Sequence, residues 1–290
     1  GTFQFIALKN DYKLLKDFTD YVIDRHYDYI KGNINPYLSL LKEVMSRQID
    51  LIINWSRVGF IHGVMNTDNF TISGETIDYG PCAFMDSYDP KTVFSSIDRQ
   101  GRYSFENQRN ICLWNLARFA ECLIPLIDNN SEIAISLVNE VLEEFSSIFE
   151  SRWIKMMGEK LGIKNLLDRQ LSDKFLQYLE DENRDYTQGF RELLNKDFRN
   201  KKSENKVLSC FLELYRTYNI DYDLIKNSNP VYIPRNHIVE DVLSKIKNGE
   251  TTPLQELLDK LKNPYRGNPE DFYAKPPESI NVNYKTYCGT

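Results

Sequence analysis

The sequence predicts a mainly helical chain with one small β-hairpin in its N-terminal third, and three observations support this fold class. Long stretches repeat apolar residues at three- and four-residue steps, as helices with one buried face require. Residues 70–77 place β-branched and aromatic residues on both sides of Ser-Gly-Glu, which is typical of a short hairpin. Residues 263–290 are rich in proline and have no period, so we expect an extended tail.

The first helices are predicted from their capping residues. Asn10 or Asp11 can cap a helix that runs to about residue 30. Asn35 followed by Pro36 supplies a cap and a first-turn proline for a second helix over residues 37–58. Six apolar residues recur at helical spacing in this second helix and predict a buried stripe: Leu38, Leu41, Met45, Ile49, Ile52 and Trp55.

An irregular segment is expected over residues 80–107, because it carries two prolines and two glycines without any period. Beyond it nearly all of the pattern is helical, and Asn129 with Glu132 can form a capping box. The predicted helices are 109–127, 131–161, 165–182, 186–194, 204–218, 237–247 and 253–261. We therefore divide the chain into residues 1–130, a helical extension at residues 131–262 and the tail at residues 263–290.

The composition excludes several classes of protein. Of the 290 residues, 41% are hydrophobic and 27% charged, which is typical of a soluble globule, and the net charge of -6 argues against nucleic-acid or anionic-membrane partners. We see no apolar run near the roughly 18 residues that a membrane span needs. The first residues lack the features of a secretion signal. We therefore expect no membrane and no nucleic-acid partner, although a targeting segment could lie upstream of Gly1.

The cysteines are widely spaced and contain no CxxC pair, so they predict neither a zinc site nor a disulfide scaffold. Their odd number fits a reducing interior. One of them lies close to the end of the sequence, where a thiol is expected to be exposed. The five are Cys82, Cys112, Cys122, Cys210 and Cys288.

The chemistry is concentrated in residues 62–81, HGVMNTDNFTISGETIDYGP. His62 precedes Asn69 by seven residues, which is the spacing of the kinase catalytic loop HRDxxxxN, and nine residues later Asp78 opens DYG, a variant of DFG. An amide and a carboxylate oxygen there can hold Mg²⁺ against ATP phosphates. The position of the catalytic Asp holds Val64, which cannot accept a proton. A carboxylate stands instead at Asp68, so the metal ligands are kept and the base has moved.

Spacing alone leaves a simpler interpretation open. Asp68 and Asn69 could form only a polar turn, with DYG as the exit of the hairpin. In either interpretation we assign His62 a structural role as a hydrogen-bonded histidine.

Four long motifs in register resemble one family. They are HGVMNTDN, TIDYGPCAF, SSIDRQGRY and WNLARFAE, and the opening GTFQF, the tripeptide RHY and the terminal CGT agree with them. In these motifs the chain is similar to the selenoprotein O (SelO, YdiU) family. The resemblance implies a protein-kinase-like C-lobe for residues 1–130. It also implies that ATP binds in a flipped orientation and that AMP, rather than phosphate, is transferred to Ser, Thr or Tyr hydroxyls of proteins.

The same resemblance implies roles for individual residues. Asp68 corresponds to the proton acceptor, and Asn69 and Asp78 correspond to ligands of Mg²⁺ or Mn²⁺, with Asp78 also close to the ATP phosphates. It further implies a redox disulfide between the tail and the activation segment, for which Cys82 and Cys288 are the pair. Bacterial members are cytoplasmic and eukaryotic members largely mitochondrial, so the compartment depends on the source.

One departure from the family pattern limits what this chain is expected to do alone. No Gly-rich loop and no phosphate-binding lysine on a strand can be placed, so we interpret the chain as the C-terminal lobe and tail of such a protein. We expect weak nucleotide binding and little transfer by the 290 residues themselves. Two alternatives remain: a protein kinase that uses Asp68 as a surrogate base, and a catalytically silent pseudokinase scaffold.

Overall fold

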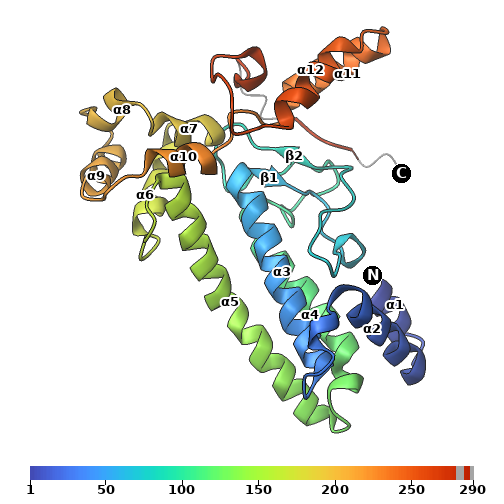
Figure 1. The fold of residues 1–290 in the computed structure, drawn as a ribbon. Helices are drawn as coiled ribbons and strands as arrows, with labels where there is room; N and C mark the ends of the chain where they lie inside the picture. Colours follow the sequence, from blue (N-terminus) through green and yellow to red (C-terminus); the bar gives the residue numbers. More distant parts are fainter. Residues whose placement is uncertain (279–283, 288–290) are drawn as a thin grey trace. The chain divides into compact units, whose positions relative to one another are not determined.

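The computed structural model describes residues 1–278 and 284–287 (Figure 1). This part of the chain is mainly helical, as predicted, and includes a two-stranded antiparallel sheet of β1 (Phe60–Ile61) and β2 (Ala83–Phe84). The α-helices are α1 (Thr2–Ala7), α2 (Tyr12–His26), α3 (Pro36–Val58), α4 (Gln108–Ile127), α5 (Ser131–Leu161), α6 (Gln170–Asp181), α7 (Tyr186–Glu192), α8 (Lys196–Asn200), α9 (Lys206–Tyr215), α10 (Tyr222–Ser228), α11 (Asn236–Lys247) and α12 (Thr252–Leu261). Three short 3₁₀ turns are η1 (Asp28–Ile30), η2 (Thr67–Asn69) and η3 (Phe272–Ala274).

The three longest helices begin and end within one residue of the predicted limits. The caps that the sequence suggests for α2 and α3 are present, because Asp11 Oδ1 accepts a hydrogen bond from Leu14 N at 2.9 Å and Asn35 Oδ1 accepts one from Leu38 N at 3.0 Å. Of the predicted stripe on α3, only Leu38 is half-buried, and the other five residues are buried.

The predicted cap of α5 is one residue out of register. Asn130, rather than Asn129, accepts the hydrogen bond from Glu132 N, at 2.9 Å. Both asparagines are compatible with the sequence pattern, and the backbone hydrogen bond from Ala134 N to Asn130 O decides between them.

Several short elements were not predicted, namely α1, α8, α10, β1 and β2, and α8 lies between the predicted helices at residues 186–194 and 204–218. Helices of five to seven residues are too short to display a period. The two strands form through pairing with each other, Phe60 with Phe84 and Ile61 with Ala83, and this pairing joins residues far apart in the chain. The predicted hairpin at residues 70–77 is reduced to a single β-bridge, Phe70 to Thr76.

The chain forms two compact units, which we describe separately. The first consists of Gly1–Ile53, Val64–Tyr79 and Asn107–Ser151. The second consists of Asn54–Gly63, Gly80–Glu106 and the described chain from Arg152 onward. The division at residues 130 and 262 rests on sequence motifs, and it stays a prediction.

Aromatic packing anchors the N-terminal helix of the first unit. Phe3 of α1 is buried, and its ring centroid lies 4.8 Å from that of Phe18 on α2 and 4.9 Å from that of Phe119 on α4, both in edge-to-face geometry. The helix α1 therefore packs against both α2 and α4. The buried stripe of α3 and the apolar faces of α4 and α5 supply the rest of this core.

The second unit has an aromatic core of its own. The ring of Phe175 on α6 lies 4.9 Å from Phe190 on α7 and 4.8 Å from Phe211 on α9. Tyr186 is fully buried at the start of α7, and its hydroxyl donates a hydrogen bond to Ser56 O at 2.9 Å. The helical extension thereby packs on the last turn of α3, the turn that leads into β1.

A buried lysine lies in the same core. Lys160, near the end of α5, is 1% exposed, and its Nζ donates a hydrogen bond to Arg57 O at 2.6 Å. The rings of Tyr186 and Phe190 lie 4.8 Å and 4.1 Å from Nζ, so the amine meets a carbonyl oxygen and two aromatic faces. Burial lowers the pKa of Lys160 well below its ordinary value, with a smaller contribution from the charge of Arg57.

One helix is long and apolar enough to cross a membrane if length and composition are the only criteria. This helix is α4, half of whose apolar window is buried inside the protein, as in a core helix. It corrects our statement that no apolar run approaches the length of a span.

Candidate active site

The loop that carries the predicted site begins at a glycine whose position leaves no room for a Cβ atom. Gly63 follows β1 with a φ of +84°, and a Cβ atom there would lie 2.7 Å from Pro81 O. The close approach of these two backbones brings both ends of residues 63–81 together in the second unit. His62, just before this glycine, is 1% exposed and its ring centroid lies 5.2 Å from that of Trp55, which agrees with a structural role.

The hairpin after the loop closes on the bridge between Phe70 and Thr76. Its turn is held by Thr71, whose Oγ1 donates to Glu75 O at 2.8 Å and accepts from Glu75 N at 2.9 Å. Gly74 at the tip has a φ of +77° and approaches Arg47 so closely that a Cβ atom would lie 2.8 Å from the Cβ of Arg47. The turn is thus shaped both by its own residues and by α3.

Two neighbouring side chains of α3 hold the hairpin backbone. Gln48 Nε2 donates a hydrogen bond to Thr71 O at 2.5 Å, and Arg47 Nη1 donates to Ser73 O at 3.5 Å. Tyr27, in the RHY tripeptide, donates its hydroxyl proton to Ile72 O, and the guanidinium of Arg47 lies 4.3 Å from the centre of the Tyr27 ring. Burial raises the pKa of Tyr27 to about 12, so its hydroxyl remains a donor at neutral pH.

The three predicted site residues flank the bridge on the side away from the turn. Asp68 and Asn69 directly precede Phe70, and Asp78 follows Thr76 by two residues. The chain therefore enters the hairpin through Asp68 and Asn69 and leaves it through Asp78. The side chains of Asp68 and Asp78 are not buried, and Asn69 is half-buried.

Asn69 also closes the loop that precedes it. Its Nδ2 donates a hydrogen bond to Val64 O at 2.9 Å, and its backbone N donates to Asn66 O at 3.0 Å. Because the amide nitrogen is used inside the protein, the orientation of the side chain is set and its oxygen is the atom left for a ligand. Val64, at the place of the usual kinase base, is 8% exposed, so this position belongs to the core.

Asp78 has a left-handed backbone conformation, with a φ of +57°. Asp and Asn adopt this conformation more readily than other residues with a Cβ atom. The strain of such a residue is commonly kept where a side chain must be aimed in one direction. The conformation is compatible with a functional role for this carboxylate and equally with the exit of a hairpin.

A cavity of about 370 Å³ lies beside Asp68 in the first unit. Its walls come from α1, α2, α3 and α4 and from the loop, and aromatic side chains such as Phe3, Phe18 and Phe119 contribute to them. Asp68 therefore lies between solvent and an apolar hollow. A carboxylate in this place can accept a proton from a hydroxyl group.

Few side chains of the candidate site could bind a metal ion. Among residues 1–278 and 284–287, no group of three or more His, Cys, Asp or Glu side chains is arranged to hold a metal ion. The amide oxygen of Asn69 and the carboxylate of Asp78 are hard oxygen donors, which suit Mg²⁺ or Mn²⁺. Mg²⁺ in kinase-type sites usually takes one or two protein ligands and completes its shell with water and substrate phosphates.

Asn115 is a contributor that the sequence analysis did not identify, although it lies in the motif WNLARFAE. It is 5% exposed on α4, and its Nδ2 donates hydrogen bonds to Met65 O at 2.9 Å and to Ile111 O at 3.0 Å. Met65 is in the middle of HGVMNTDN and is fully buried. A polar residue within an apolar helical face was the available signal, but its partner could not be known from spacing.

We expect the substitution Asn115→Ala to lower the free energy of unfolding by about 1–3 kcal/mol, because it leaves the buried carbonyl of Met65 without this donor. Urea denaturation measures this loss, and hydrogen exchange should be faster over residues 65–69. Asn110→Ala on the same helix is the matched control, since Asn110 is exposed and its Nδ2 donates to Asn107 Oδ1 in its own turn. Equal losses in the two variants would contradict the role of Asn115.

The comparison with protein families supports the resemblance seen in the motifs. The profile of the family described as Protein adenylyltransferase SelO matches residues 1–262, and the chain belongs to this family. Among its relatives are proteins named protein nucleotidyltransferase YdiU, from Pelagibacter ubique and Alkaliphilus metalliredigens (both 45% identical) and from Clostridium botulinum strain Loch Maree (43% identical). Each alignment covers 100% of this chain and 62% of the relative. In the experiments below, the name extended protein means this chain together with the additional residues that bring it to the length of those relatives.

Proposed function

We propose that the chain supplies the catalytic hairpin of a protein adenylyltransferase, which moves AMP from ATP to Ser, Thr or Tyr hydroxyls of partner proteins. The observation that carries the proposal is the hairpin itself. In a member of the SelO family, Asp68 and Asn69 directly precede the bridge between Phe70 and Thr76 and Asp78 follows it by two residues, while a buried Val64 stands at the usual position of the base. The mainly helical fold with a minimal sheet is compatible with a protein-kinase-like C-lobe, which we also propose.

The three residues have two roles in this reaction, one as proton acceptor and two as metal ligands. Asp68 accepts the proton of the attacking hydroxyl, and the hydroxyl oxygen forms a bond to the α-phosphorus of ATP. The bond from that phosphorus to the oxygen shared with the β-phosphate breaks, and pyrophosphate leaves with the electron pair. Asn69 and Asp78 would hold Mg²⁺ or Mn²⁺, which supplies charge stabilisation to the phosphates when it is bound.

Intact-mass spectrometry tests this proposal. The extended protein is incubated with ATP, Mg²⁺ and a generic protein substrate, and this chain alone is treated in the same way. An AMP-sized increment made by the extended protein, with little made by the 290 residues, is the expected result. A phosphate-sized increment would support a kinase that uses Asp68 as its base, and no increment would support a scaffold.

We also propose a redox disulfide between Cys82 and Cys288, although Cys288 lies outside the described residues. Thr286, two positions earlier in the sequence, is among the residues that the structure describes. Its Oγ1 donates a hydrogen bond to Pro81 O at 2.5 Å, and Pro81 directly precedes Cys82. Thr286 also forms a parallel bridge with Ser95, so this part of the tail pairs with the segment that follows DYG.

Peptide mapping without reduction should recover residues 82 and 288 in one linked species after mild oxidation of the extended protein. Cys210 is the internal control, because it is exposed on α9 and should stay a free thiol. Recovery of both Cys82 and Cys288 as free thiols from oxidised protein would remove this pairing.

A further inference from the structure

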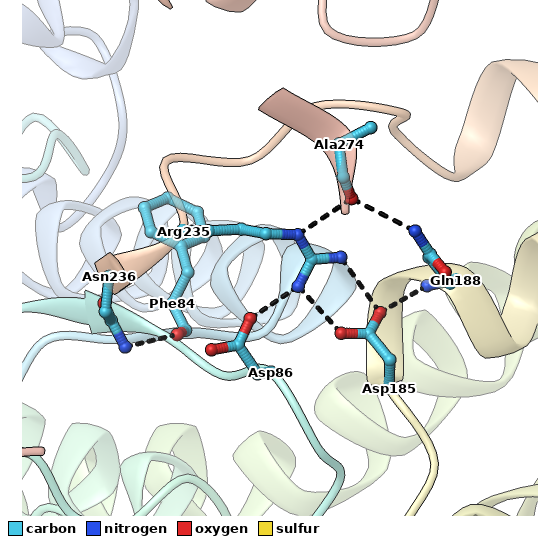
Figure 2. Close-up of polar contacts among 7 residues, drawn as sticks. All are labelled: Phe84, Asp86, Asp185, Gln188, Arg235, Asn236 and Ala274. Carbon is cyan, nitrogen blue, oxygen red and sulfur yellow. Dashed lines mark hydrogen bonds and ion pairs between the residues drawn. The ribbon is translucent and has the colours of Figure 1, made fainter. Parts of the chain in front are cut away.

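A single arginine joins three segments of the second unit (Figure 2). Arg235, at the start of α11, is 0% exposed, and its guanidinium donates four hydrogen bonds. Nη1 binds Asp86 Oδ1 at 2.5 Å and Asp185 Oδ2 at 2.7 Å, and Nη2 binds Asp185 Oδ1 at 3.2 Å. Nε donates to Ala274 O of η3 at 3.0 Å. We call this group the Arg235 clamp.

The clamp holds the segment that follows DYG by its backbone as well as by a carboxylate. Asp86 comes two residues after β2, and its carbonyl oxygen accepts a hydrogen bond from Tyr186 N at 2.7 Å. Asn236, next to Arg235, donates its Nδ2 to Phe84 O at 3.3 Å (Figure 2). A further β-bridge joins Ser87 to Asp185. The path of residues 84–87 is therefore fixed by the helical extension.

Electrostatics make the clamp selective for an arginine. Burial opposes the charge of Arg235, but the two carboxylates outweigh it and raise the pKa of the guanidinium. Burial also raises the pKa of Asp86, and Arg235 acts against this rise. The planar guanidinium makes four hydrogen bonds from three nitrogen atoms, and a lysine ammonium, with three donors on one nitrogen, cannot reproduce them.

A structural role alone explains this arrangement poorly. Buried ion pairs contribute little stability compared with apolar residues of similar volume, and their best-attested use is to specify one geometry. Here the specified segment begins a few residues after Asp78, and its strand β2 pairs with β1, which leads into the loop with Asp68. Within the second unit, the clamp thus holds the segment into which the chain continues from Asp78, and this segment pairs through β2 with β1, from which the chain continues into the loop with Asp68.

We propose that Arg235 is a positioning residue for nucleotidyl transfer, which sets the course of residues 80–88 and through them the aim of Asp78. This inference rests on the proposed function. It also explains what the helical extension and the tail contribute, because α7, α11 and η3 together hold the segment that follows the metal ligand.

The test compares Arg235→Lys and Asp86→Asn with Arg191→Lys in the extended protein. Arg191 is the matched control, since it is a partly buried arginine of α7 whose Nη1 donates to Asn229 O at 2.8 Å, away from residues 80–106. We expect kcat for AMP transfer to fall about 10- to 100-fold in the two clamp variants, because small displacements of reacting groups have effects of this size. The Mg²⁺ concentration for half-maximal rate should rise, whereas Arg191→Lys should change neither quantity.

Thermal melting and circular dichroism show at which temperatures every variant is folded, and the rates of AMP transfer are compared only at those temperatures. Hydrogen exchange gives a readout that needs no activity: peptides with the amides of Met85 and Tyr88, which donate to Gly59 O and Arg184 O, should exchange faster in Arg235→Lys. Clamp variants that transfer AMP at the rate of Arg191→Lys would overturn the inference. If the unsubstituted protein transfers no AMP, the proposed function fails. In that case hydrogen exchange still tests the clamp, and an unchanged exchange rate in Arg235→Lys would show that Arg235 does not hold residues 80–88.

Discussion

Asp78→Asn in the extended protein is expected to lower the rate of AMP transfer about 100-fold or more without unfolding the protein. The substitution removes the charge that would hold the metal ion, and such an ion supplies several kcal/mol of transition-state stabilisation. Asparagine keeps the shape of the side chain and adopts the left-handed conformation at least as readily as aspartate, so the φ of +57° adds no new strain. Intact-mass spectrometry over a time course measures the rate.

Asp17→Asn is the control for this experiment, because Asp17 is an aspartate on α2 outside the hairpin. It removes the same charge from the first unit and should leave the rate unchanged. Asp68→Asn should lower the rate by about 10²–10⁴-fold, the usual contribution of a general base. Full transfer by Asp78→Asn would mean that the hairpin is a scaffold and that the family chemistry uses other residues.

The stability of the protein is expected to rise with pH relative to a Lys160→Met variant. The pKa of Lys160 is lowered in the folded state, whereas in the unfolded chain it returns to its ordinary value near 10.5. Between these two values the unfolded state binds more protons than the folded state, so raising the pH favours folding. The difference in free energy of unfolding between wild type and variant should grow by at most about 1.4 kcal/mol per pH unit in this window.

Denaturant titrations of both proteins between about pH 7 and about pH 9 measure this difference. Lys155→Met is the matched control, since Lys155 is an exposed lysine on the same helix. The difference in free energy of unfolding between Lys155→Met and the wild type should not change with pH. If the difference for Lys160→Met is also constant, the bond to Arg57 O and the two aromatic faces keep the ammonium charged at its ordinary pKa.

Long elements were predictable, because their signal is local and repeated. The apolar stripe of α3 and the caps at Asp11 and Asn35 are contained in the sequence near each helix. The strands β1 and β2 could not be predicted, since two residues have no period and their pairing joins positions distant in the chain. The hairpin was expected to have strands, but Gln48 and Tyr27 take the carbonyls of Thr71 and Ile72 as acceptors.

The sequence alone was enough to indicate the candidate chemistry, through the spacing of Asp68, Asn69 and Asp78, the lack of a carboxylate at position 64, and membership of the SelO family. Those features are short-range, because one loop and one turn contain the site residues. Only the tertiary structure showed which distant side chains hold the neighbouring segments, namely Asn115 at Met65 of the loop and Arg235 at Asp86 after DYG. Their partners lie 50 and 149 residues away in the chain, and no local pattern can specify which buried donor meets which distant acceptor.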